Sequence, residues 1–246
     1  MRRNALCLLA WFAATLGMLP AQQPVRDQPP PYRGAFTQVD GVFVTPIAGA
    51  PFSATVLIQS KQALADGTVE NKSTQAQVAR DSRGRIRNEQ HVLVPESFRG
   101  TPPLLSTHIF DPETRISYFL NPATMIARQR WVPPPPQGVD AGNNKGEDLG
   151  YSTLNGLQAK GTRISQTIPA EASGTGRPVV VTDEFWYSEE LHMNLLERHT
   201  DVRGGEQTVA ILSIKRNEPA AALFEVPAGY KVVDLTPPAL APMANR

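Results

Sequence analysis

Short runs in which apolar and polar residues alternate follow one another along most of this chain. The run 52–64 is apolar and β-branched in its middle, whereas the run 68–80 alternates polar and apolar positions. Neighbouring side chains of a strand point to opposite faces, so a period of two is typical of β-strands. The pattern predicts further strands at 85–94, 107–110, 116–120, 125–132, 156–168, 179–187, 193–200 and 207–214.

Tight turns separate these predicted strands. The pair Asp66-Gly67 is the strongest two-residue hairpin signal, and three later turns also begin with aspartate, at Asp81, Asp111 and Asp201. Strands joined by such short turns pair antiparallel, because parallel pairs need long crossovers. The predicted fold class is therefore mainly β, a large antiparallel meander with little helix.

The start of the chain predicts export. A short positive segment is followed by an uncharged run over 5–19 and then by a polar stretch. This order is typical of a Sec-type signal peptide, here 1–21, with cleavage between Ala21 and Gln22. The uncharged run is shorter than the roughly 20 residues that a transmembrane helix needs. The expected location is the periplasm or the exterior, and because the single cysteine, Cys7, lies inside the signal, the mature chain is predicted to have no disulfide.

Composition predicts how the remaining chain is organised. We expect a Pro-rich flexible lead-in at 22–41, one β-rich domain at 42–234 with a long Pro/Gly/Asn loop at 133–150, and a disordered tail at 235–246. No later segment looks transmembrane. The chain has 24 Lys and Arg against 23 Asp and Glu, and this balance argues against a nucleic-acid partner.

Three arginines are candidates for contacts with anionic groups. Arg83, Arg85 and Arg87 have a spacing of two, which predicts that their side chains share one face of a strand. Guanidinium groups in a row could hold phosphate or lipid headgroups. The alternative is a solvated outer face, since Glu89 continues the same side and exposed charges are common.

Motifs for metal or covalent chemistry do not stand out. None of the four histidines has a metal-ligand spacing, and no nucleophile elbow, P-loop or dinucleotide fingerprint occurs. The carboxylates of Asp183 and Glu184 near Trp186 leave a secreted hydrolase conceivable, but such pairs are more often surface residues. We therefore expect a protein that is not an enzyme and that uses no metal and no cofactor.

Large apolar side chains provide candidates for a binding groove. The aromatic residues alternate faces along their strands, which also fits ordinary packing. In the last predicted strand we expect Ala210, Leu212 and Ile214 to face the concave side of the sheet, with Val209, Ile211 and Ser213 on the other side. The candidate groove consists of Phe110, Phe119, Trp131, Trp186, Ala210, Leu212 and Ile214.

The order of several short motifs resembles a known family. The motifs lie at 79–87 (ARDSRGRIR), 109–115 (IFDPETR), 118–122 (YFLNP), 183–187 (DEFWY) and 217–230 (NEP followed by LFEVPAGY). In this order the chain resembles the periplasmic outer-membrane lipoprotein carriers (LolA) and secreted bacterial proteins related to them. The resemblance implies an unclosed, concave β-barrel in the periplasm that can hold an acyl chain. The chain departs from the carriers in one respect, because the amphipathic helices that plug their cavity are not found in the sequence.

Three hypotheses for function remain open on this basis. The first is a periplasmic or secreted binding protein that holds a lipid or a lipid-linked partner, such as a lipoprotein, in a concave β face. The second is a regulatory or structural envelope protein that docks a protein partner on that face or on a sheet edge. The third and least favoured is a secreted hydrolase, which would need polar side chains that converge in a pocket.

Overall fold

Strands dominate the computed structural model, which describes residues 41–64, 66–134 and 146–237. These residues belong to one of two units, Arg33–Arg246; the other unit, Met1–Tyr32, lies outside the described residues together with the predicted signal peptide and its cleavage site. The strands are β1 (Phe52–Ala63), β2 (Val69–Arg80), β3 (Ile86–His91), β4 (Val94–Pro95), β5 (Leu104–Asp111), β6 (Ile116–Asn121), β7 (Ile126–Trp131), β8 (Glu147–Leu154), β9 (Leu157–Ile168), β10 (Val179–Ser188), β11 (Met193–Asp201), β12 (Gly205–Lys215) and β13 (Lys231–Asp234). The helices are α1 (Ala170–Ser173) and the 3-10 turn η2 (Ala221–Phe224).

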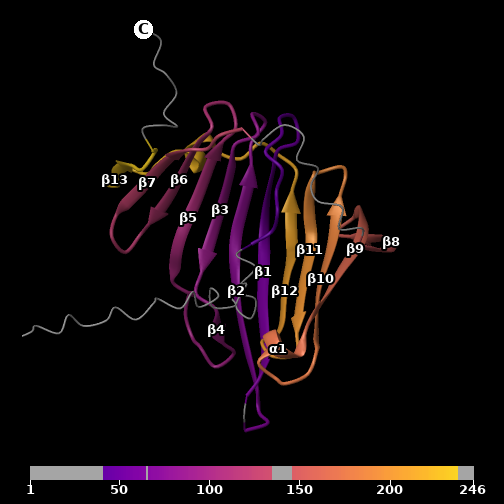
Figure 1. Cartoon of the computed structure of the whole chain (residues 1–246). Coiled ribbons are helices and arrows are strands. Elements are labelled where there is room, and N and C mark those ends of the chain that lie inside the picture. Colours follow the sequence, from indigo (N-terminus) through magenta and orange to yellow (C-terminus); the bar gives the residue numbers. More distant parts are fainter. Residues whose placement is uncertain (1–40, 65, 135–145, 238–246) are drawn as a thin grey trace, which may run out of the picture. The chain divides into compact units, whose positions relative to one another are not determined.

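All thirteen strands belong to one sheet that does not close on itself. Its order is β13-β7-β6-β5-β3-β2-β1-β12-β11-β10-β9-β8, with β4 paired to β2 off this path. Figure 1 shows β13 and β8 at the two ends of this row. Neighbours pair antiparallel except for β13 and β7, which are parallel. The predicted fold class, mainly β with an unclosed antiparallel sheet and little helix, is confirmed.

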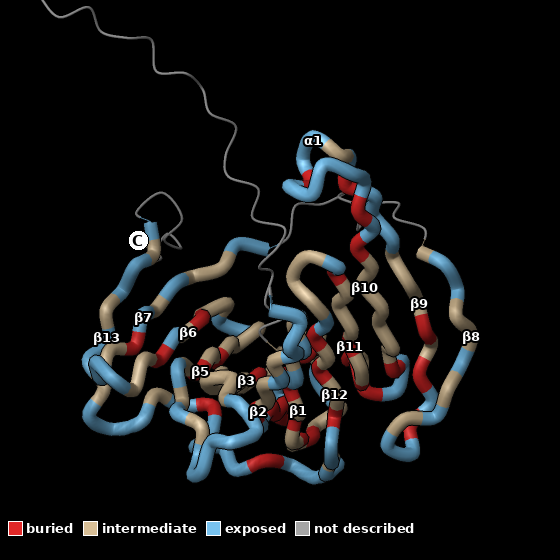
Figure 2. The backbone as a smooth tube through the Cα atoms, turned by 90° about the horizontal axis from the view of Figure 1, so that it is seen from below, coloured by how far each residue is buried: buried red, intermediate tan, exposed pale blue. Residues whose placement is uncertain are grey.

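The sheet has two faces, which β1 defines. Val56 points to one, here called the Val56 face, and Leu57 points to the other, the Leu57 face. The main core packs on the Val56 face of β1, β2 and β12. Figure 2 marks buried residues along these strands. Its members include Phe52, Ala54, Val56, Ile58, Ala76, Val78, Val209 and Ile211, together with Val42 and Val44 from the segment before β1.

Buried Arg80 secures the segment before β1. Its guanidinium donates hydrogen bonds to the carbonyls of Thr45, Ala50 and Leu191 at 2.7–3.0 Å. A charged group that is fully buried must have such partners, because an uncompensated one would cost several kcal/mol. Arg80 therefore fixes the connection between the centre of the sheet and the turn before β11.

A second core lies on the Leu57 face. Ala79 follows Val78 in β2 and so points to the opposite face, where it packs with Ile109, Leu120 and Ala127 of β5, β6 and β7. Phe224 of η2 covers this cluster and is 5% exposed. The segment between β12 and β13 thus shields the Leu57 face at the β13 end of the sheet.

One bulge changes which residues share a face in β12. Thr55 pairs with Ser213 but Val56 pairs with Ile211, so Leu212 is an extra residue. Ile214 consequently returns to the Val56 face and packs against the main core. The predicted grouping of Ala210, Leu212 and Ile214 on one face is wrong for Ile214, and Val209 and Ile211 rather than Ala210 and Leu212 are the buried residues.

Two predicted boundaries also need correction. Strand β8 begins at Glu147, inside the loop predicted at 133–150, whose central part 135–145 lies outside the described residues. The predicted tail starts too early, because Leu235 N donates to Gln129 O and Trp131 N donates to Thr236 Oγ1. No helix in the described part of the chain is long and apolar enough to cross a membrane.

Candidate functional site

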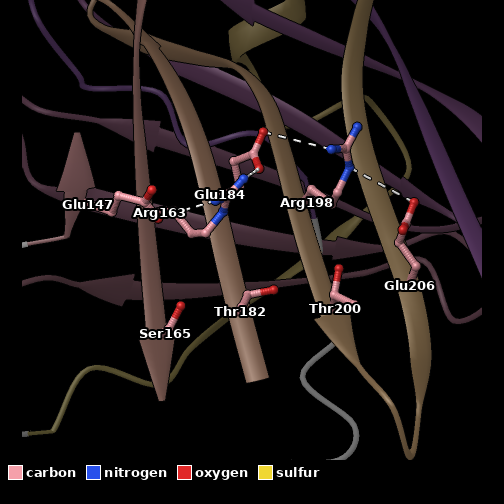
Figure 3. A pocket seen from close by; sticks show the side chains of 8 residues that line it. All are labelled: Glu147, Arg163, Ser165, Thr182, Glu184, Arg198, Thr200 and Glu206. Carbon is pink, nitrogen blue, oxygen red and sulfur yellow. Dashed lines mark hydrogen bonds and ion pairs between the residues drawn. The ribbon is translucent and has the colours of Figure 1, made fainter. Parts of the chain in front are cut away.

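Five neighbouring strands, β8 to β12, present polar side chains on the Leu57 face at the end of the sheet away from the second core. They line a hollow of about 520 Å³ (Figure 3). The lining residues are Glu147, Arg163, Ser165, Thr182, Glu184, Arg198, Thr200 and Glu206.

The strand register brings these residues together. Arg163 lies opposite Glu184, which lies opposite Arg198, and the next row in the same direction is Ser165, Thr182 and Thr200. Within each strand the two rows are two residues apart, so their side chains share one face. The site is thus built from polar pairs of period two in successive strands.

Charge alternates from strand to strand across the hollow, and Glu206 of β12 reaches this series from a position opposite Thr200 of the second row. Arg163 lies 3.2 Å from Glu147 and 3.1 Å from Glu184, measured between guanidinium nitrogen and carboxylate oxygen. Arg198 lies 3.8 Å from Glu184 and 3.9 Å from Glu206. We call these five residues the charge row; each of its charges has an opposite charge beside it.

Glu184 is the central carboxylate of the charge row, and its side chain is only 12% exposed. Burial raises the pKa of this carboxyl, but the hydrogen bonds from Trp186 Nε1 (2.7 Å) and Arg163, with the attraction of Arg198, outweigh burial and lower the pKa. Glu184 is therefore ionised at neutral pH.

One donor of the charge row lacks an acceptor. The Nε of Arg198 is buried and makes no hydrogen bond within the described residues, since the carboxylate of Glu206 is too far away at 3.9 Å. A buried donor without a partner is costly, so this position favours an additional acceptor or a small movement of Glu206.

The second row consists of the hydroxyls of Ser165, Thr182 and Thr200, here called the hydroxyl row. No hydrogen bond joins these hydroxyls to another side chain or carbonyl in the described ranges. Adjacent strands are about 4.8 Å apart, so the hydroxyls form a regular series that can donate to and accept from a bound molecule.

A third row, of apolar residues, lies beside the charge row on the same face. Trp186 pairs with Leu196, Leu196 pairs with Ala210, and Ala210 pairs with Leu57. All four are partly exposed. This apolar row contains two members of the predicted groove, Trp186 and Ala210, and they are the two that the register brings close together.

The other predicted groove residues are dispersed. Phe110 and Phe119 lie on the Val56 face of β5 and β6, whereas Trp131 lies on the Leu57 face of β7. Leu212 is 46% exposed at the bulge of β12, and Ile214 packs against the main core. Trp186, like Ile214, also packs against the main core, whereas the other four residues of this set do not belong to that cluster.

The three predicted anion-binding arginines do not form a stripe. Only Arg87 belongs to β3, because Arg83 and Arg85 lie in the turn that precedes it, so the expectation that they share one face of a strand is wrong. Each pairs with a nearby carboxylate at 2.5–2.8 Å: Arg83 with Glu113, Arg85 with Asp81 and Arg87 with Glu89.

Histidine contacts of the kind used in catalysis occur at two separate places. His108 Nε2 lies 2.7 Å from Ser117 Oγ on β5 and β6, and His199 Nδ1 lies 2.6 Å from Asp183 on β10 and β11. Four strands, β3, β2, β1 and β12, separate these pairs in the sheet. In the described residues no group of three or more possible ligands is placed to hold a metal ion.

Sequence reasoning missed most of the hollow. Glu184 was considered only together with Asp183, but neighbouring strand residues point to opposite faces. The sequence signal that could have found the hollow is a pair of polar residues two positions apart, repeated in several strands. It occurs as Arg163 and Ser165, Thr182 and Glu184, and Arg198 and Thr200.

Comparisons with known proteins give only distant likenesses. No family model matches the chain, and no curated protein matches it. Solved structures that match include a conserved protein from Thermus thermophilus (15% identity, TM-score 0.42, 75% of this chain and 90% of that chain). The MucA/MucB complex of Pseudomonas aeruginosa matches with 12% identity and a TM-score of 0.40; this chain covers 58% of that chain, and 74% of this chain is aligned.

A LolA superfamily protein from Nitrosomonas europaea is also among the solved structures that match. Its identity is 10% and its TM-score 0.31, with 74% of this chain and 92% of that chain covered. The family that the sequence motifs resemble therefore appears among the structural matches. With TM-scores of 0.42, 0.40 and 0.31, these likenesses carry no argument about function.

Proposed function

We propose that this chain is an exported, non-enzymatic binding protein that docks a protein partner on the Leu57 face of β8 to β12. The observation that carries the proposal is the arrangement of three parallel rows on one open face: apolar, charged and hydroxyl. Protein interfaces combine an apolar part with charged and hydrogen-bonding groups in this way. Export is supported by the pattern of the first 21 residues.

The three rows have the size of the central part of a protein interface. Five strands spaced about 4.8 Å apart extend over about 19 Å, and the three rows add width along the strands. One side of a small, reversible interface covers roughly 600 Å², so surrounding residues of the Leu57 face would complete it. The alternating charges fix how a partner is aligned across the five strands, because a partner shifted by one strand would meet like charges.

The lipid hypothesis has less support. An acyl chain needs an apolar channel, and contact between an acyl chain and the charge row would remove water from Glu184 and Arg198 without replacing its hydrogen bonds. The residues predicted for an apolar groove are spread over both faces. A lipid-linked partner that docks through its protein part remains compatible with the three rows.

Site-specific photo-crosslinking tests the proposal directly. Ser165 and Gln166 are consecutive exposed residues of β9 that point to opposite faces, so they form a matched pair. We expect a photoreactive side chain at 165 to give a discrete protein adduct in cells, and the same group at 166 to give none. The substitution Arg198→Ala should weaken the adduct from 165.

Two results of these experiments would contradict the proposal. Equal adducts from positions 165 and 166 would contradict docking on the Leu57 face. The lipid hypothesis would replace the proposal if organic extracts of the purified chain contained about one lipid per protein and no protein adduct formed. Mass spectrometry of the extract and of the adduct separates these outcomes.

A further inference from the structure

The Val56 face at the β13 end of the sheet has an unusual charge pattern. The residues that β3, β5, β6, β7 and β13 present on this face include no aspartate and no glutamate. The nearby carboxylates of Glu89, Asp111 and Asp234 belong to these strands but point to the Leu57 face. This part of the sheet therefore carries positive charge on one face without acidic neighbours there.

Three cations lie on this acid-free face. Arg128 and Arg130 of β7 and Lys231 of β13 are exposed, and no ion pair joins them to a carboxylate in the described residues. Arg85, Arg163 and Arg203, in contrast, each lie within 3.2 Å of a carboxylate oxygen. The charges of Arg128, Arg130 and Lys231 are thus available to an external anion.

An exposed aromatic ring lies beside these cations. Phe119 is directly across from Arg128 in the register and is 47% exposed. Its ring stacks on His108 with centroids 4.4 Å apart and planes 14° apart. Burial lowers the pKa of His108, and its Nε2 lies 2.7 Å from Ser117 Oγ, so a neutral, fixed ring supports Phe119.

We propose that these residues, Phe119, Arg128, Arg130 and Lys231, form a docking surface for an acidic, extended segment of a partner protein. We call it the cationic strip. Residues two apart in a strand are separated by about 6.7 Å, which is also the spacing of alternate carboxylates in an extended peptide. Arg128 and Arg130 then pair with two such carboxylates, and the aliphatic part of the glutamate that meets Arg128 packs on Phe119, which lies directly across from this arginine.

An anionic membrane surface is the less favoured occupant. On the same face Phe119 is flanked by Ser117 and Asn121 of β6, and Asn88 lies beyond His108, so polar side chains interrupt the apolar surface around the ring. A lipid headgroup would be held by charge alone and would not use the stacked ring. The inference goes beyond the proposed function, because it concerns the other face, the other end of the sheet and a partner of defined charge.

Binding measurements on the full chain test this surface with defined probes. We expect a twelve-residue peptide with glutamate at alternate positions and valine between to bind, and a block peptide of the same composition to bind more weakly. The double substitution Arg128→Ser and Arg130→Ser should weaken the alternating peptide about tenfold, which corresponds to the loss of two exposed ion pairs. The control pair Arg99→Ser and Arg177→Ser removes the same charge elsewhere and should leave binding unchanged.

Phosphatidylglycerol vesicles provide the second probe. The proposal would be overturned if the chain bound vesicles through Arg128 and Arg130 but did not bind the peptide. The occupant of the cationic strip would then be a membrane surface. Failure of both probes would also overturn it, as would equal losses in the test and control pairs. The variant Phe119→Ser keeps both arginines, and thermal melting verifies that it is folded. It should bind the alternating peptide more weakly than the wild type does.

Discussion

The two ends of the Leu57 face differ in polarity and in how they are covered. At the β13 end, Ile109, Leu120 and Ala127 make the face apolar, and Phe224 covers it. At the β8 end, the charge and hydroxyl rows make the face polar around a hollow of about 520 Å³. An open sheet must either shield an apolar face or make it polar. On the Leu57 face, the covered apolar cluster thus lies at the β13 end and the polar hollow at the β8 end.

The strongest test of this contrast is the substitution Phe224→Ala. Phe224 is 5% exposed, and removing such a side chain costs about 3–5 kcal/mol of unfolding free energy. Urea unfolding followed by fluorescence measures the loss. Leu223→Ala is the matched control, since the adjacent Leu223 is 37% exposed and should cost less than about 1 kcal/mol. Similar losses for both would mean that η2 does not anchor the second core.

The apolar end was the more predictable from the sequence. Period-two patterns and aspartate-led turns predict most strands, because burial on one face forces the alternation. Strand β8 was missed: its sequence EDLGYSTL has few β-branched residues and follows a Pro- and Gly-rich stretch. The bulge at Leu212 was also not predictable, since an extra residue in one strand is visible only against its partner.

The polar hollow at the β8 end depends on which residues lie opposite each other in neighbouring strands, so it could not be predicted from the sequence. A single strand shows that Arg163 and Ser165 share a face, but not that Glu184 and Thr182 lie opposite them. The cross-strand distances that create the charge row come from five segments spread over 147–206. The sequence shows the type of each residue, but it does not show which residues of other strands lie beside it.

Acidification should weaken the β13 end first. Burial lowers the pKa of His108 below its ordinary value of 6.5, so the unfolded chain binds this proton more readily than the folded one. Stability from this group is present above pH 6.5 and falls as the pH decreases below it, by at most about 1.4 kcal/mol per pH unit. Glu184, with a pKa below its ordinary 4.5, adds its loss only under more acidic conditions.

The variant His108→Gln isolates this contribution. Its unfolding free energy, measured by urea titration between pH 7.5 and 5, should depend less on pH than that of the wild type. Glu184→Gln should leave the slope of the curve between pH 7.5 and 5 unchanged and alter the slope only below about pH 4.5. Parallel curves for His108→Gln and wild type would contradict the assignment.

At neutral pH the charge row should contribute modestly to stability. Glu184→Gln keeps an acceptor for Trp186 but leaves Arg163 and Arg198 without their central anion, and we expect a loss of about 1 kcal/mol. Glu147→Gln is the control, because its side chain is 63% exposed and solvent screens its pair with Arg163. The control should change stability by less than about 0.5 kcal/mol. A larger loss for Glu147→Gln would show that the open edge, and not the centre, stabilises the row.

The smallest effect on stability should come from the hydroxyl row. Thr182→Val preserves the shape of the side chain and removes a hydroxyl that has no hydrogen-bond partner in the described residues, so the unfolding free energy should change by less than about 0.5 kcal/mol. The same substitution should reduce the protein adduct formed from a photoreactive group at 165. Ser117→Ala provides the contrast: Ser117 is 2% exposed and its hydroxyl is hydrogen-bonded to His108, so removing the hydroxyl should cost about 1 kcal/mol without affecting that adduct. A hydroxyl that matters for the partner and not for folding belongs to a binding surface, whereas the reverse result for Thr182 would place the hydroxyl row among the structural elements of the sheet.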